Sequence, residues 1–111
     1  MAAPNLGSLE LTILLAVARL GDEAYGLSIR RDLAARTGRD YSVGAVYTTL
    51  ERLESKGFVT SRKTAPVAKR GGRSRRQFRV TAAGQRAIRR AERTARLVWA
   101  GVAAFPNPET A

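Results

Sequence analysis

The hydrophobic pattern of this chain changes its period at Gly57, and this change constrains the fold more than any other feature. Before Gly57, apolar residues recur every three or four positions, which is the period of a helix. After it, Phe58 and Val59 and then residues 77–80 follow the short alternation that is typical of strands. Thr81 begins a second region of helical period. The chain is therefore expected to be mainly α with a small β-hairpin, an α+β class.

Three helices are expected before the hairpin. The first begins at Ser8 as N-cap and ends at Gly21, and the second covers about residues 25–37 and stops at Gly38. The third begins at Ser42 as N-cap. Its apolar residues repeat at intervals of three, four and three and are expected to face the core: Val43, Val46, Leu50 and Leu53.

The outer face of the third helix carries unusually small side chains in its first turns. Its residues there are small or bear a hydroxyl group: Ser42, Gly44, Ala45 and Thr48. They leave room for a large partner to approach closely. Tyr47 lies at the edge of this face, where we expect it to contact a phosphate; packing at the edge of the core is the alternative.

Positive charge is concentrated in one third of the chain. Residues 1–59 are neutral overall, whereas residues 60–96 hold 13 basic residues against a single acid, Glu92. Such asymmetry indicates a polyanionic partner, either nucleic acid or an anionic membrane face. Part of this charge falls in the expected hairpin loop, around Gly71 and Gly72: Lys69, Arg70, Arg73, Arg75 and Arg76.

The residue types that are missing argue against catalysis. The sequence contains no Cys and no His, which excludes thiolate metal sites and removes the commonest metal ligand and general base. Asp22 and Glu23 precede a helix, whose dipole explains them. The apolar stretch 11–18 is too short to span a membrane. We therefore expect a cytoplasmic protein that is not an enzyme and has no metal site or cofactor.

Thr81 is expected to cap a last helix with two contrasting faces. One face is a heptad seam, which we interpret as a dimer interface: Ile88, Ala91, Ala95, Val98, Val102 and Phe105. The other carries Arg86, Arg89, Arg90, Arg93 and Arg96. The seam folding back on its own domain is the alternative, and a membrane-bound helix is disfavoured because the alanines supply little apolar area. Trp99 is expected either to pack in the dimer core or to form a flat wall for a planar hydrophobic effector.

Three helices, a hairpin with a basic loop and a further helix follow the order of a winged helix-turn-helix, in which the third helix enters a major groove. Four motifs follow one another along the chain: Tyr25-Gly26, Gly44-Ala45-Val46-Tyr47 with Leu50-Glu51-Arg52-Leu53 and Lys56-Gly57, Gly71-Gly72-Arg73, and Phe78-Arg79-Val80-Thr81-Ala82-Ala83-Gly84. Through these motifs the sequence resembles the PadR family of bacterial transcriptional regulators over about residues 8–90. The resemblance implies a homodimeric repressor whose C-terminal helices join the two halves.

The sequence therefore predicts a DNA-binding domain at 1–80, a dimerisation helix at 81–105 and a disordered tail at 106–111. We expect a repressor that binds a double-stranded operator as a homodimer and is released by a small molecule. A non-specific nucleic-acid-binding protein and a winged-helix module that docks on proteins are the alternatives. The expected DNA contacts are Ser42, Gly44, Ala45, Tyr47, Thr48, Lys69, Arg70, Arg73 and Arg75.

Overall fold

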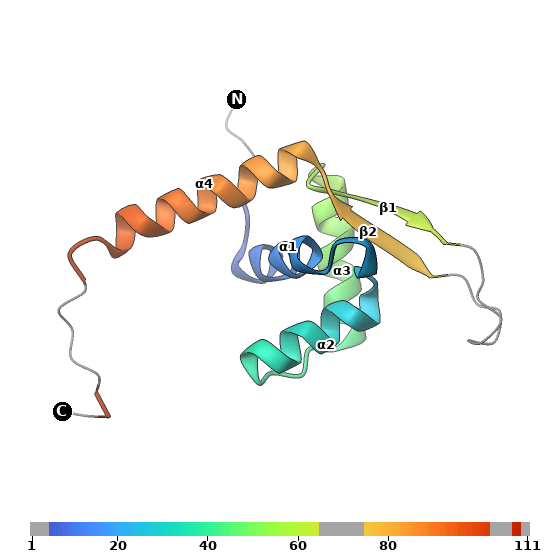
Figure 1. Cartoon of the computed structure of the whole chain (residues 1–111), viewed down its shortest axis with the longest axis horizontal. Helices are drawn as coiled ribbons and strands as arrows, with labels where there is room; N and C mark the ends of the chain where they lie inside the picture. Colours follow the sequence, from blue (N-terminus) through green and yellow to red (C-terminus); the bar gives the residue numbers. More distant parts are fainter. Residues whose placement is uncertain (1–4, 65–74, 103–107, 110–111) are drawn as a thin grey trace.

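The computed structural model describes residues 5–64, 75–102 and 108–109. Within these residues the chain forms a helical body, a two-stranded antiparallel hairpin and a long final helix (Figure 1). The elements are α1 (Ser8–Leu20), η1 (Gly21–Glu23), α2 (Gly26–Thr37), α3 (Val43–Ser55), β1 (Val59–Lys63), β2 (Arg76–Val80) and α4 (Ala82–Trp99). This is the expected α+β architecture of a winged helix.

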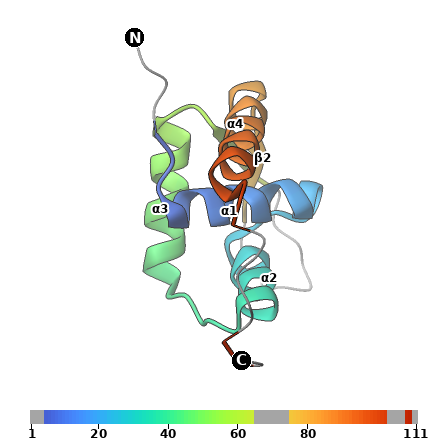
Figure 2. The same ribbon diagram turned by 90° about the vertical axis from the view of Figure 1, so that its left-hand side faces the viewer.

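α1 is the centre of the body. It packs against α2, α3 and α4, and in Figure 2 it lies between α2 below and α4 above. Its residues Ile13, Leu14 and Val17 are buried, as an apolar helix enclosed on several sides requires. The hairpin closes the core with Phe58 and Phe78, which are both 2% exposed.

Local capping chemistry sets several of the helix boundaries. The Ser42 hydroxyl accepts a hydrogen bond from the Ala45 N–H (3.1 Å), and the Thr81 hydroxyl accepts one from the Gly84 N–H (3.0 Å). Gly38 ends α2 with a φ of 70°, in the left-handed region that favours glycine. These three expected boundaries are confirmed.

The N-terminus of α1 differs from the expectation at Ser8. The N-cap is Gly7, and Ser8 is the first helical residue. The Gly7 N–H donates to Oε1 of Glu10 (2.7 Å), which is the contact that the N3 carboxylate of a capping box makes with the N-cap backbone.

The buried face of α3 also differs at its first residue. Val46, Leu50 and Leu53 are buried as expected, but Val43 is 50% exposed. The fourth buried position is Thr49, whose hydroxyl is satisfied by donating to the Ala45 carbonyl (2.7 Å). Val43 is wrong as a core residue because the turn of α3 that packs on the body begins at Val46.

The hairpin has a fixed register and a second backbone neighbour. Its pairs run from Val59 opposite Val80 to Lys63 opposite Arg76. Beside it, the backbone of Tyr25 forms a bridge with that of Gln77. β2 is therefore paired on both edges near this point, which explains why the polar Gln77 is only 4% exposed.

α4 is shorter than the sequence pattern suggested. It ends at Trp99, and Gly101 adopts a φ of 84°, which interrupts a right-handed helix. Val102 therefore lies beyond the helix, and the expectation that the helical seam continues through it is wrong. Phe105 and most of the tail expected at 106–111 lie outside the described residues.

No helix in the described part of the chain has the length and apolarity needed to span a membrane.

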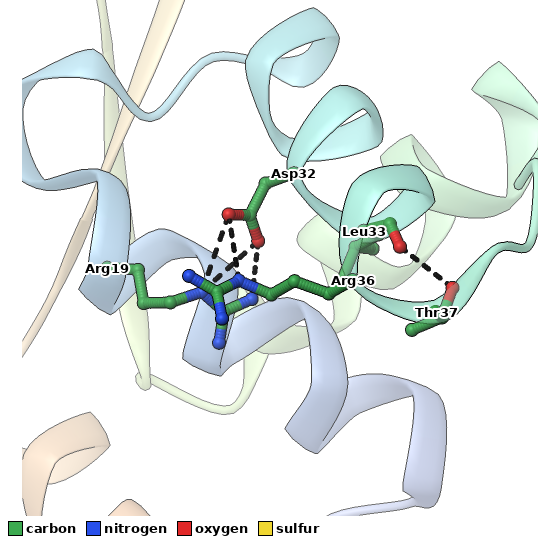
Figure 3. A network of polar contacts seen from close by, with 5 residues as sticks. All are labelled: Arg19, Asp32, Leu33, Arg36 and Thr37. Atoms are coloured by element: carbon green, nitrogen blue, oxygen red, sulfur yellow. Dashed lines mark hydrogen bonds and ion pairs between the residues drawn. The ribbon is translucent and has the colours of Figure 1, made fainter.

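Two partly buried carboxylates are held in ion pairs. Burial alone would raise the pKa of Glu10, but hydrogen bonds from Lys56 and the Gly7 N–H, together with nearby positive charge, hold it below its ordinary value of 4.5. Figure 3 shows Arg19 and Arg36 converging on Asp32. The hydrogen bond from Arg19 is the main cause that lowers the pKa of Asp32 below 3.8; burial opposes it and Arg36 adds to it.

Acid should weaken these ion pairs. A carboxylate with a lowered pKa stabilises the folded state above its unfolded pKa and loses this contribution as pH falls through the folded value. Asp32→Asn should lower the free energy of unfolding at pH 7 by about 1 kcal/mol. The difference should disappear well below pH 3.8. Urea denaturation of wild type and variant at pH 7 and well below pH 3.8 measures this difference, and Glu51→Gln, at an exposed position, is the control. If wild type and Asp32→Asn were equally stable at pH 7, the ion pairs of Asp32 would have no net stabilising role.

Candidate nucleic-acid interface

The residues expected to read DNA lie together on the outward side of the first turns of α3. Ser42, Gly44 and Thr48 are exposed, Ala45 is half-buried and Tyr47 is 40% exposed. Val43, which the sequence pattern placed in the core, joins this surface. The face thus combines small side chains with one aromatic ring.

Tyr47 lies over the start of α2. A Cβ atom at Gly26 would be 2.5 Å from Cζ of Tyr47, so only glycine leaves room for the ring in this position. The N-terminus of α2 carries free N–H groups and the positive end of the helix dipole. The phenolic hydroxyl of Tyr47 and the N-terminus of α2 can therefore bind the same anion.

A depression of about 360 Å³ extends from this point to the loop end of the hairpin, where Lys63 lies opposite Arg76. Its lining combines three cationic side chains with two aromatic rings and no acid: Tyr25, Gly26, Leu27, Tyr47, Lys63, Arg75 and Arg76. The charge and the free helix N–H groups suit a phosphate group.

Contacts with the protein orient the cations at this depression. The guanidinium of Arg75 lies over the Tyr25 ring, 3.8 Å from its centroid. Nη1 of Arg76 donates to the Ser61 hydroxyl (2.9 Å). The Thr64 N–H and hydroxyl both donate to the Arg75 carbonyl, at 2.7 Å and 3.0 Å, and so extend the pairing of the strands at the loop end of the hairpin.

Further hydrogen bonds hold the hairpin against the connection between α1 and α2. The Phe78 N–H donates to the Ala24 carbonyl (2.9 Å), and Nε2 of Gln77 donates to the Asp22 carbonyl (2.8 Å). Arg79 pairs with the Asp22 carboxylate at 2.8 Å. These contacts give β2 a fixed orientation relative to the start of α2. Lys69, Arg70 and Arg73, which were expected to contact DNA, lie outside the described residues.

Five residues that line this depression were not among the expected DNA contacts: Tyr25, Gly26, Leu27, Lys63 and Arg76. Arg76 was expected only as part of the charge of the basic loop. Lys63 lies opposite Arg76 in the hairpin, and this could have been inferred from the register once the strands were aligned. Tyr25 is brought to the depression by the backbone bridge between Tyr25 and Gln77. No local sequence pattern predicts this bridge.

Only some residues of the expected dimer seam line the same groove. Ala91, Ala95, Val98 and Trp99 line a groove of about 730 Å³ together with Leu6 of the N-terminal segment. Val98 and Trp99 are 70% and 71% exposed. Ile88, the first residue of the seam, instead lines a smaller groove between α1, β2 and α4.

The chain is similar to known proteins over most of its length. Residues 14–90 match the family described as "Transcriptional regulator PadR-like family". The crystal structure of a PadR family transcriptional regulator from Eggerthella lenta is 29% identical with a TM-score of 0.66, covering 86% of this chain and 84% of the other.

More distant structures share the fold. A PadR-like regulator from Bacillus cereus is 21% identical with a TM-score of 0.68, and covers 85% of this chain and 86% of its own. A transcriptional regulator from Clostridium thermocellum is 21% identical with a TM-score of 0.69, at 89% and 93% coverage. No curated protein sequence gives a significant match. Since the family match extends over more than half of the sequence, the chain belongs to the PadR-like family of transcriptional regulators.

Proposed function

We propose that this regulator is a repressor that binds a specific double-stranded operator as a homodimer and is released by a small molecule. The observation that carries the DNA-binding part is the convergence at one depression of three groups that can bind an anion. These are the N-terminus of α2, the Tyr47 hydroxyl above it and the cations at the loop end of the hairpin. A phosphate bound there would place the small-residue face of α3 against base edges.

The proposed contacts divide into two kinds. Ser42, Gly44, Ala45, Tyr47 and Thr48 set the register of α3 in the major groove and its base preference. The basic hairpin residues neutralise phosphates and release counterions whatever the sequence: Lys69, Arg70, Arg73 and Arg75.

A titration that compares a promoter fragment from the chromosomal neighbourhood with scrambled DNA of the same length tests this function. Specific regulation requires a preference of roughly a thousandfold or more at physiological salt, and protection of a dyad. Equal affinity for both fragments would leave a non-specific nucleic-acid-binding protein, which the basic charge alone also supports. Absence of binding to either would favour a module that docks on proteins.

Arg75 should contribute affinity without selectivity. Arg75→Gln is expected to weaken binding to operator and scrambled DNA by a similar factor. It should reduce the slope of log affinity against log salt by about two units, because each protomer of the dimer loses one phosphate contact. Titration of both DNAs at several salt concentrations measures both effects. A loss confined to the operator would mean that the loop end of the hairpin reads sequence.

Gly26 should control the position of Tyr47. Gly26→Ala puts a methyl group where the ring now lies, and it should lower operator affinity about tenfold because the phenol must move away from the phosphate. Thermal stability should change little, since the displaced atoms are at the end of a side chain. The matched control is Gly26→Ala in a Tyr47→Ala background, where the two losses should not add. Additive losses would show that Gly26 acts without Tyr47.

The proposed release mechanism uses the groove beside Trp99. Half-sites of an operator lie about one helical turn, roughly 34 Å, apart, so a small rotation between the α4 helices would misalign both recognition helices. A planar hydrophobic compound that prefers the misaligned dimer would shift the population towards it. Quenching of Trp99 fluorescence identifies binders. A binder that quenches Trp99 but leaves operator affinity unchanged would make Trp99 a packing residue.

A further inference from the structure

The face of α4 opposite the seam carries a stripe of positive charge that the interface described above does not use. Arg86, Arg89, Arg93 and Arg96 follow one another at intervals of three, four and three, and all four are exposed. We call these four residues the arginine stripe. Gly84 and Ala87, which α4 buries against the body, lie on the other side of the helix. The stripe therefore points away from the body.

The stripe is short of negative partners. Among the described residues, the only carboxylate paired with it is that of Glu92, at 3.3 Å from Arg96, and both side chains are largely exposed. Arginines three and four positions apart repel one another along a helix. Several cations elsewhere on the helical body and hairpin are instead paired with acids: Arg19 and Arg36 with Asp32, Arg30 with Asp40, Lys56 with Glu10 and Arg79 with Asp22. An external anion would offset the repulsion that the stripe leaves uncompensated.

A polyanion with closely spaced charges fits the dimensions of the stripe. Arg86 and Arg96 are about 15 Å apart along the helix axis. Duplex DNA carries one negative charge per about 1.7 Å, so this length of DNA presents about nine. An anionic membrane is less suitable, because a helix on a membrane buries bulky apolar residues next to its basic ones along its length. In the described part of α4, the large apolar side chains that are well exposed lie only at the C-terminal end: Leu97, Val98 and Trp99.

The DNA proposed to bind α2 and α3 would lie on another side of the molecule. In Figures 1 and 2, α1 lies between α4 and α2. The stripe is on the side of α4 opposite to Gly84 and Ala87, which α4 buries against the body. A straight duplex seated at the N-terminus of α2 therefore leaves the stripe free. The seam, on the opposite face of α4, is likewise separate from it.

We propose that the arginine stripe binds the phosphate backbone of a second DNA segment without regard to sequence, so that a repressor on its operator also holds a second duplex. This inference rests on the proposed function for the first segment. In a dimer joined through the seam, two stripes would be available at once. Contact through phosphates alone needs charge but no defined base sequence.

A capture assay with the full chain tests the stripe. A short operator duplex is immobilised and saturated with protein, and a labelled duplex of scrambled sequence is then added. The wild type should retain the labelled duplex. Arg86→Gln combined with Arg89→Gln, Arg93→Gln and Arg96→Gln should bind the operator within about twofold of the wild type but capture at least about tenfold less labelled DNA. Undiminished capture would overturn the proposal.

Matched variants separate charge from shape and from folding. Lysine at the same four positions keeps the charge and should preserve most of the capture; a loss equal to that of the glutamine variant would overturn a purely electrostatic contact. Circular dichroism checks that the helices form. If the fourfold glutamine variant is unfolded, the pairs Arg86→Gln with Arg89→Gln and Arg93→Gln with Arg96→Gln are compared instead, and each should lower the salt slope of capture by about two units.

Two further arms distinguish the outcomes. If the wild type shows no preference for the operator but still captures labelled duplex through the stripe on immobilised scrambled DNA, the proposed function fails and the second site stands. Phosphatidylglycerol vesicles replace the labelled duplex in the other arm. Stripe-dependent vesicle binding without stripe-dependent DNA capture would identify a membrane surface and overturn the proposal.

Discussion

Ala95→Glu combined with Val98→Glu is expected to turn the protein into a monomer and to lower operator affinity at least about hundredfold. The seam would bring the same residues of two protomers together, so four added carboxylates would repel one another at the interface. A monomer holds one half-site and loses the gain from binding two linked half-sites, which is about 10² to 10⁴. Sedimentation equilibrium and an operator titration measure the two effects.

Leu97→Glu is the matched control for this double variant. Leu97 is on the same helix and 72% exposed, but it does not line the groove formed by Ala91, Ala95 and Val98. The control should remain a dimer and keep its operator affinity. A double variant that still sediments as a dimer would mean that another surface joins the protomers and that the seam faces its own domain.

Sequence predicted the helix boundaries best where a single side chain satisfies a backbone group. Ser42 and Thr81 were identifiable as caps because their hydroxyls reach N–H groups three residues ahead. Ser8 was misassigned although it is of the right type, because Glu10 reaches back to Gly7 and moves the cap by one residue. Two local signals competed, and the sequence alone did not rank them.

The candidate site was predictable on α3 and only partly predictable around it. Small residues on an exposed helical face, with Tyr47 at the edge, form a local pattern that the sequence displays directly. The depression depends instead on backbone pairing between Tyr25 and Gln77, which are far apart in the chain. The need for glycine at position 26 is not visible in the sequence either, because it comes from the Tyr47 ring that lies over this position in the fold.

The end of α4 shows the limit of periodicity as a guide to length. The apolar spacing runs on past Val98, so the pattern predicted a helix as far as residue 105. Periodicity reports which side chains would share a face if the helix continued, but it carries no information on whether the backbone does so. The backbone leaves the helical conformation at Ala100, whose ψ is 131°, and Gly101 follows with a positive φ.

The largest expected loss of stability comes from a methyl group at Gly84, where α4 meets the hairpin. A Cβ atom there would overlap the Phe58 carbonyl oxygen and lie 2.7 Å from Cγ1 of Val80. The carbonyl accepts a hydrogen bond from the Thr81 N–H (3.0 Å), so it cannot turn aside without breaking the junction between β2 and α4. Gly84→Ala should therefore lower the free energy of unfolding by about 3 kcal/mol, although alanine favours helix by about 1 kcal/mol.

The control is Gly44→Ala on the open face of α3, where a Cβ atom would meet no atom within 4 Å of those described. That change should stabilise the protein by about 0.5 to 1 kcal/mol. Urea denaturation of the two variants measures the difference. If Gly84→Ala were as stable as Gly44→Ala, α4 could not pack as closely against the hairpin as it does here. The direction in which α4 leaves the body would then have to change. Both the seam and the arginine stripe depend on this direction.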